Sequence, residues 1–112
     1  MCKGKYRLDK ALEKAAVRMK YVERIRNIVL DQLKNETVCI SLFGSWARGT
    51  QHHGSDVDIA IDFKGKNNPL KIAEIREILE ESTIPYSVDV VDMHNASEGI
   101  LQEIKKDGIR WK

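Results

Sequence analysis

The sequence is poor in cysteine and proline and has no long apolar run, and these shortages exclude several classes of protein. Its 112 residues include two cysteines, Cys2 and Cys39, too few for a disulfide framework. With two prolines and no internal repeat, the chain contains no low-complexity segment. No apolar stretch approaches the roughly 18–20 residues of a membrane span, and residues 1–6 lead into a charged segment without an apolar signal core. We therefore expect a cytoplasmic protein without membrane contact.

Length and composition predict one globular domain, residues 1–112, with a single modest core. The net charge of +2 conceals an asymmetry, because residues 1–26 contain nine basic and three acidic side chains and the remainder is acidic. A basic segment attracts nucleic acid or an acidic partner. We favour a solvated helix face as the explanation and do not expect direct nucleic-acid binding.

Residues 7–34 are predicted to form a helix, because apolar side chains recur there at three- and four-residue steps without an interrupting glycine or proline. One continuous helix of this length would span about 40 Å, more than a domain this small needs. Its second half, residues 20–34, is expected to cover a sheet. The first half, within residues 1–20, either projects as an arm whose apolar stripe needs a partner, or folds back after a break near Met19.

The rest of the sequence alternates strands and helices. The expected elements are strands at 37–43, 56–63 and 86–93, a short helix after Gly44, a helix that begins at Pro69 and ends before residues 83–85, and a last helix at 96–107. Residues 109–112 either add a short edge strand or pack Trp111 on the sheet. This interleaved order predicts a two-layer α/β (α+β) domain, with helices packed on a small sheet.

Small residues follow the first strand, and acidic residues occupy the next two. Gly44 lets a phosphate approach the backbone closely, and Ser45 adds a hydroxyl donor at the turn. Asp56 and Asp58 share one face of an alternating strand, with Cα atoms roughly 6.5–7 Å apart, and Asp89 on the third strand can complete the set. Such carboxylates repel one another unless a cation offsets them, and Mg²⁺ prefers carboxylate and phosphate oxygens. The pattern predicts a site for a nucleoside triphosphate and metal ions.

Four other residues could bind a ligand, but we favour a simpler structural interpretation for each of them. For Asp62 we favour a solvated strand end, and strand alternation turns Asp92 away from Asp89. His52 and His53 fall in the loop between the two halves of the motif. Imidazole binds transition metals and phosphate, but an ordinary loop position is the interpretation we favour.

The chain resembles a known family at these positions. The run Gly44-Ser45, followed after ten residues by Asp56-Val57-Asp58, resembles the signature of the DNA polymerase beta-type nucleotidyltransferase superfamily. The fuller pattern, with Ala-Arg-Gly after the turn and Ser before the first aspartate, resembles its minimal nucleotidyltransferase (MNT) branch over roughly residues 37–93. Trp46 departs from this pattern, because many members carry arginine there. The resemblance implies a small mixed sheet with its acidic positions meeting at one edge, and a single minimal nucleotidyltransferase domain.

The resemblance also implies residue roles. Gly44 and Ser45 would hold the β- and γ-phosphates of ATP. Asp56 and Asp58 would bind two Mg²⁺ ions, and Asp89 would ligate the second ion and help to deprotonate the attacking hydroxyl. The implied reaction is nucleotidyl transfer, in which a hydroxyl attacks the α-phosphate and pyrophosphate leaves.

Arg48, in the same motif, would stabilise phosphate charge or brace the turn. Stand-alone MNT proteins commonly act as antitoxins beside a helical HEPN-family toxin, which is an RNase. Because the chain has no second domain to hold an acceptor, the resemblance implies AMP transfer from ATP to a hydroxyl of such a protein partner. Two alternatives stay open: transfer to a small, antibiotic-like molecule, and a non-catalytic module that masks its partner by binding. The stripe on the first helix suits a homo-oligomer as well as a hetero-oligomer.

Overall fold

The computed structural model describes the backbone of residues 2–51 and 54–112 and the side chains of residues 17–51 and 54–112. The elements in chain order are α1 (Cys2–Gln32), β1 (Val38–Phe43), α2 (Gly44–Arg48), β2 (Val57–Phe63), α3 (Pro69–Glu81), β3 (Val88–Asp92), a short 3₁₀ helix η1 (Met93–Asn95), α4 (Glu98–Asp107) and β4 (Ile109–Arg110). None of the described helices is both long and apolar enough to cross a membrane.

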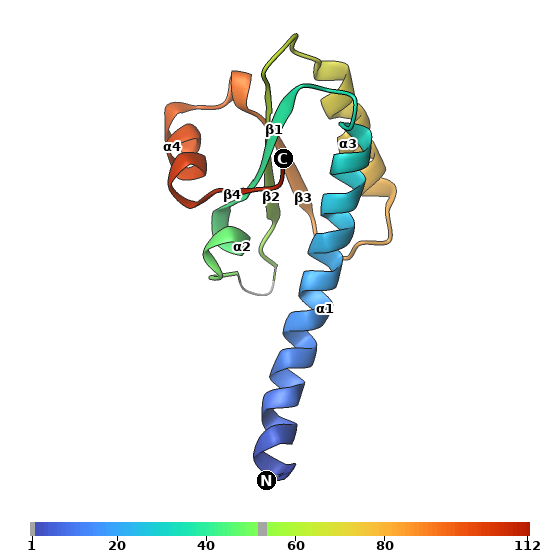
Figure 1. Ribbon diagram of the computed structural model, residues 1–112, viewed down its shortest axis with the longest axis vertical. Coiled ribbons are helices and arrows are strands. Elements are labelled where there is room, and N and C mark those ends of the chain that lie inside the picture. Colours follow the sequence, from blue (N-terminus) through green and yellow to red (C-terminus); the bar gives the residue numbers. More distant parts are fainter. Residues whose placement is uncertain (1, 52–53) are drawn as a thin grey trace.

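The strands form one mixed sheet in the order β3–β2–β1–β4 (Figure 1). β1 pairs antiparallel with β2 and β4, whereas β2 and β3 run parallel and are joined through α3. The expected α+β fold, with helices packed on a small mixed sheet, is confirmed. The two alternatives for the C-terminal residues both hold, because β4 is a short edge strand and Trp111 packs against the main core.

Alternation along the strands divides the apolar residues between two faces of the sheet. The face toward α1 and α3 holds the main core, which includes Ile25, Ile40, Ile59 and Ile75. The other face holds a smaller cluster in which Phe43, Ala60 and Ile104 join β1 and β2 to α4. Figure 1 shows α1 and α3 on one side of the strands and α4 with α2 on the other. The second face is therefore only partly covered, and this face carries the acidic positions.

α1 is one uninterrupted helix with no break at Met19. Its second half covers the sheet through buried side chains at three- and four-residue steps, namely Val22, Ile25, Val29 and Leu33. The first half extends beyond the sheet, and the molecule measures 57 × 28 × 22 Å (Figure 1). The apolar positions Leu8, Leu12 and Ala15 of the predicted stripe lie outside the described side chains.

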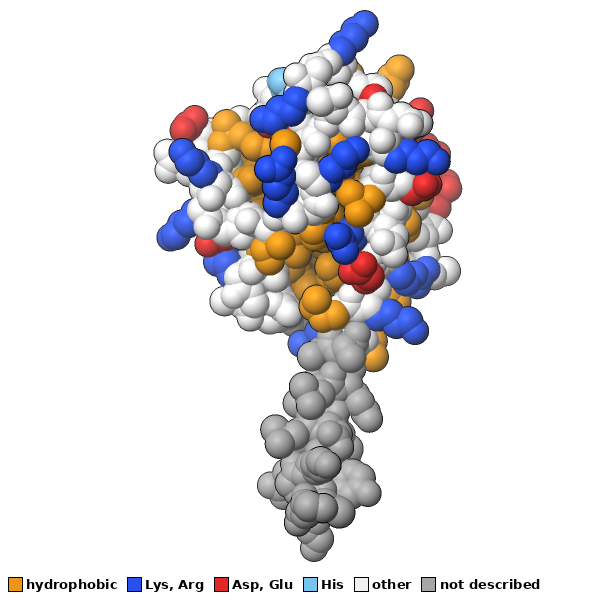
Figure 2. Space-filling model, in the orientation of Figure 1, with side chains coloured by type: hydrophobic (Ala, Val, Ile, Leu, Met, Phe, Trp, Pro, Cys, Tyr) orange, Lys and Arg blue, Asp and Glu red, His pale blue; other side chains and the backbone are white. Residues whose placement is uncertain are grey.

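The surface near the base of the arm is partly apolar. Val17 and Met19 on α1 and Ile109 on β4 are exposed. Figure 2 shows apolar side chains gathered over the strands beside α1, with lysine and arginine side chains scattered around them.

Two helix boundaries have clear local causes. α3 begins at Pro69, and the side chain of Asn68 caps it by accepting a hydrogen bond from the backbone N–H of Lys71. α4 begins at Glu98, two residues later than the sequence predicts, because Ser97 is its N-cap and accepts from the N–H of Ile100. The chain before that cap forms η1 instead.

Candidate active site

The acidic strands meet in a fixed register. Asp58 on β2 and Asp89 on β3 are direct Cα partners in the parallel pair, so their side chains share one face of the sheet. Asp56 is exposed and stands just before β2, two residues from Asp58. The structure thus places Asp58 and Asp89 side by side at the N-terminal ends of β2 and β3, with Asp56 two residues before Asp58.

The turn after β1 packs directly against this acidic group. Phe43, the last residue of β1, pairs with Asp58, so Gly44 stands beside the Asp58 carboxylate. Gly44 has a φ of +75°, which favours glycine, and a Cβ added there would overlap Oδ2 of Asp58. α2 begins at Gly44 and contains the half-buried Ser45, and it ends at Gly49 in a left-handed conformation. Glycine is therefore required both by the backbone conformation and by the closeness of the carboxylate.

Burial and neighbouring carboxylates raise the pKa of Asp58 from 3.8 to about 6. Loss of water around the side chain is the largest cause, followed by the negative charges of Asp89, Asp56 and Glu103. Arg48 acts in the opposite direction. A bound cation would stabilise the charged form of Asp58.

Arg48 links α2 to α4. Its Nη1 lies 3.1 Å from Oε1 of Glu103 and 3.5 Å from Oδ2 of Asp107. The hydrogen bond to Glu103 is the largest cause of a raised pKa for Arg48. These contacts join the end of α2 to α4.

Glu103 is a residue of the site that the sequence does not identify. It contributes to the raised pKa of Asp58 and binds Arg48, although it lies on the last helix. The only signal in the sequence is that Glu103 is a charged residue on an amphipathic helix, which is typical of any solvated helix. Its role depends on α4 packing against α2 and β1, which local patterns do not specify.

Trp46 belongs to an aromatic cluster beside the site. Its side chain is buried, and its ring contacts that of Tyr86 with the centroids 5.0 Å apart, while Tyr86 contacts Tyr21 of α1 at 5.7 Å. Trp46 Nε1 also donates to the carbonyl of Ser55 at 3.4 Å. Trp46 therefore links α2 to the segment before β3 and, through Tyr86, to α1.

A hollow of about 460 Å³ opens next to this cluster. Arg18, Trp46, Asp56 and Tyr86 are among the residues that line it. It combines a cation from α1, two aromatic rings and one carboxylate of the site. This is space for a substrate next to Asp56.

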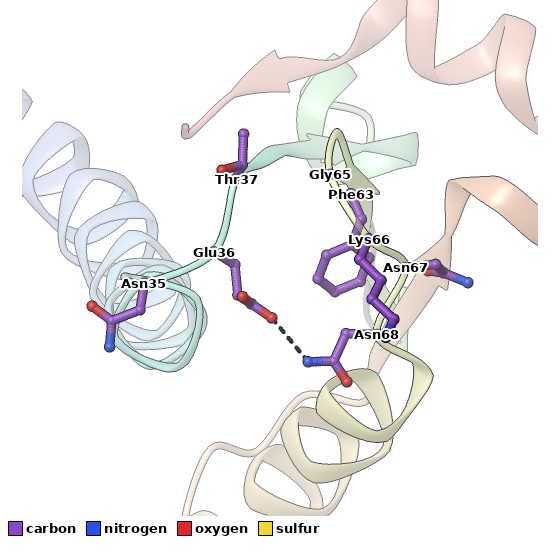
Figure 3. Close-up of a pocket in the computed structure, with 8 residues that line it drawn as sticks. All are labelled: Asn35, Glu36, Thr37, Phe63, Gly65, Lys66, Asn67 and Asn68. Carbon is purple, nitrogen blue, oxygen red and sulfur yellow. Dashed lines mark hydrogen bonds between the residues drawn. The ribbon is translucent and has the colours of Figure 1, made fainter.

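A second hollow, of about 400 Å³, lies at the opposite end of β1 and β2, where Val38 pairs with Phe63 (Figure 3). Asn68 Nδ2 donates to Oε1 of Glu36 across it at 2.9 Å. Because Asn68 also caps α3, this contact ties the turn after α1 to that helix. We assign these residues a structural role.

Asp62 and Asp92 interact with other groups of the protein. Asp62 lies 2.6 Å from Nζ of Lys64 and 3.6 Å from Nε2 of His94, so it is an ion-paired position rather than a freely solvated strand end. Asp92 is buried and caps η1 by accepting from the N–H of His94. The predictions for His52 and His53 lie outside the described residues.

The carboxylates present fit a divalent cation. Among the described residues, no group of three or more His, Cys, Asp or Glu side chains is already drawn together closely enough to hold a metal ion. The negative charges of Asp89 and Asp56 both raise the pKa of Asp58, so both lie within electrostatic reach of it. Their donors are all carboxylate oxygens, which Mg²⁺ prefers.

Comparison with known proteins identifies the class. The family described as Polymerase beta, Nucleotidyltransferase matches residues 23–110. The chain therefore belongs to the polymerase beta-type nucleotidyltransferase family and contains a nucleotidyltransferase domain.

Two relatives carry a more specific name. The chain is 36% identical over 69 residues to protein adenylyltransferase MntA of Shewanella oneidensis, covering 62% of this chain and 49% of the relative. It is 35% identical over 68 residues to protein adenylyltransferase MntA of Thermococcus cleftensis, covering 61% and 68%. The match thus spans about half the length of the Shewanella relative.

The fold is also similar to that of a crystal structure described as a toxin–antitoxin with AMP-PNP. The TM-score is 0.62 with 30% sequence identity, and the match covers 78% of this chain and 72% of the other.

Proposed function

We propose that this protein is a Mg²⁺-dependent adenylyltransferase that moves AMP from ATP to a hydroxyl of a protein partner, and that it acts in the cytoplasm as the antitoxin of an HEPN-type toxin. The register of Asp58 with Asp89, directly beside Gly44, is the observation that carries the proposal. The similarity to two proteins named protein adenylyltransferase, and to a toxin–antitoxin structure with a nucleotide analogue, supports it.

Each residue of the site has a defined part in this proposal. Gly44 and Ser45 hold the terminal phosphates of ATP, as the resemblance to the nucleotidyltransferase signature implies. Asp56, Asp58 and Asp89 would hold two Mg²⁺ ions, which when bound supply positive charge that offsets the charge of the phosphates. Asp89 also receives the proton of the attacking hydroxyl.

In the transfer step, one bond forms and one bond breaks at the α-phosphorus. The acceptor oxygen forms a bond to the α-phosphorus, while the bond from that phosphorus to the oxygen that bridges to the β-phosphate breaks. Pyrophosphate leaves with the electron pair of that bond, and the hydroxyl proton passes to Asp89. Arg48 contributes by holding α2, and therefore the phosphate turn formed by Gly44 and Ser45, against α4.

The test uses purified protein, Mg²⁺, ATP labelled at the α-phosphate and a host-cell lysate. We expect label on a protein band with the wild type and a loss of at least about 10³-fold with Asp58→Asn or Asp89→Asn, because each variant removes a carboxylate that carries charge in the site. Asp62→Asn is the matched control, since it changes the same group on the same strand outside the site. Equal labelling by Asp58→Asn and Asp62→Asn would show that the metal site is assigned wrongly.

This experiment, together with an assay of toxin neutralisation, separates the alternatives. Label on a small molecule, without any labelled protein, would identify a small-molecule nucleotidyltransferase. Neutralisation of a toxin by an Asp56/Asp58 double variant would identify a module that acts by masking.

A further inference from the structure

The outer edge of β3 has peptide groups that point away from the sheet. β3 is the end strand, with β2 on one side. The N–H of Val57 in β2 donates to the carbonyl of Ser87 at 2.9 Å, so this carbonyl points toward β2. In a trans peptide the carbonyl and the following N–H point in opposite directions, and the described residues contain no cis peptide. The N–H of Val88 therefore points outward from the sheet.

The same edge already accepts a hydrogen-bond donor. Arg76, on α3, donates to the carbonyl of Val90 from Nη2 at 2.7 Å and from Nε at 3.2 Å. This carbonyl also points outward, two residues beyond the N–H of Val88. The N–H of Val88 is an outward donor, whereas the buried carbonyl of Val90 is covered by Arg76 and must be released before another strand can pair there.

Two hollows lie between this edge and α3. One has a volume of about 500 Å³, and Leu79 and Ile84 give it apolar walls. The other, of about 280 Å³, is lined by Ile72 and Pro69 near the start of α3. Arg76 and Asp89 line both hollows, so the two hollows adjoin along β3 and have polar as well as apolar walls.

We propose that this edge is the docking surface for the acceptor, which binds as an extended segment added to β3 and presents its hydroxyl residue in register with Asp89. The proposal rests on the function proposed above and assigns how the substrate is held. In antiparallel pairing, a residue opposite Asp89 places its side chain on the same face, with the two Cβ atoms about 4.5–5.5 Å apart. Its neighbours in the segment turn to the other face, over the hollows, whose walls include Leu79, Ile84 and Ile72. Until the segment binds, Arg76 occupies the carbonyl of Val90.

A single substitution removes the outward N–H group of Val88. Val88→Pro removes the outward N–H and leaves the bonds between β2 and β3 in place, because the N–H of Val88 faces away from β2; proline is tolerated at such an edge position. Val88→Ala is the matched control, since it shortens the same side chain and keeps the N–H. Circular dichroism and thermal melting of both variants check that the fold is retained.

The probe is a nine-residue peptide with a central tyrosine, valines at the even positions and lysines at the others. With the full chain, Mg²⁺ and α-labelled ATP, we expect label on this tyrosine and slower hydrogen exchange of the Val88 amide. A peptide that is N-methylated at its valines, whose N–H groups would face β3 in antiparallel pairing, cannot form the ladder and should show neither effect. Val88→Pro should lower labelling of the peptide at least about tenfold relative to Val88→Ala, as expected for a lost ladder hydrogen bond and a ring at the edge.

Each outcome decides the matter. Equal labelling by the proline and alanine variants, or of the N-methylated peptide, would overturn strand docking and leave adenylyl transfer intact. If Val88→Pro labelled a lysate protein as strongly as the wild type does, strand docking would also be overturned and adenylyl transfer left intact, even if the peptide is not labelled. Protection of the Val88 amide by the peptide without transfer to any acceptor would support the docking surface and reject the proposed reaction. Protection of this amide by self-association alone would show that a second copy, rather than an acceptor, covers the edge.

Discussion

Gly44 and Asp58 are in such close contact that the carboxylate of Asp58 occupies the place where a Cβ of residue 44 would stand. The close contact joins the phosphate turn and the acidic strand into one unit. A change in either residue therefore moves the other, and the two halves of the motif cannot be displaced separately.

Gly44→Ala should disable transfer beyond its effect on stability. The substitution puts a side chain at a φ of +75° and forces Asp58 aside. We expect a loss of about 1–2 kcal/mol in the free energy of unfolding from backbone strain. A shift of the carboxylate by about 1 Å should lower labelling from α-labelled ATP roughly 100-fold.

Gly49→Ala is the control for this prediction. Gly49 has the same φ of +75°, but a Cβ there would meet nothing within 4 Å. It should therefore lose a similar free energy of unfolding and keep most of the transfer rate. If both variants lost transfer equally, strain in α2 rather than displacement of Asp58 would be the cause.

Stability of the metal-free protein should fall as the pH rises from about 4 to about 6. The pKa of Asp58 is higher in the folded state, at about 6, than the ordinary value of 3.8, so the folded state binds more protons across this range. The stabilising contribution is complete below pH 3.8 and is lost as the pH passes 6. Asp58→Asn should remove this dependence and, above pH 6, add about 1–2 kcal/mol to the free energy of unfolding after allowance for solvent screening.

Denaturant unfolding of the wild type and Asp58→Asn at several pH values, with EDTA present, provides the measurement. Added Mg²⁺ should raise the midpoint of the wild type above pH 6 and much less below pH 5, because protons compete for the same carboxylate. Parallel pH curves for the two proteins would show that Asp58 is not the group that titrates.

Strand alternation accounts for what the sequence reveals of the site. A polar–apolar alternation places Asp58 on one face of its strand whatever the rest of the fold does, and a turn with glycine after an apolar strand is equally local. The contact between Arg48 and Glu103 is different, because it depends on how α4 packs across the sheet. The sequence also did not decide whether α1 continues through Met19, because an unbroken apolar period is compatible with a single helix and with two helices.

Arg48 and Glu103 should act as one unit. Because their contact braces α2 against α4, Arg48→Ala and Glu103→Ala should each weaken ATP binding several-fold, and the double variant should be no worse than either single one. Binding of ATP and Mg²⁺ by calorimetry gives the three comparisons. The opposite pattern, in which Glu103→Ala tightens binding and Arg48→Ala alone weakens it, would show that Arg48 contacts phosphate directly and that Glu103 competes for it.

Tyr86 should contribute to stability through its ring rather than its hydroxyl. The ring lies against both Trp46 and Tyr21, so it joins α2 to α1 just before β3 begins. Tyr86→Ala should therefore lower the free energy of unfolding by about 2–3 kcal/mol, whereas Tyr86→Phe should change it by less than about 0.5 kcal/mol. Denaturant unfolding monitored by tryptophan fluorescence measures both. Because the segment that carries Tyr86 leads into the strand of Asp89, Tyr86→Ala should also lower transfer; an equal cost for the phenylalanine variant would instead assign the role to the hydroxyl.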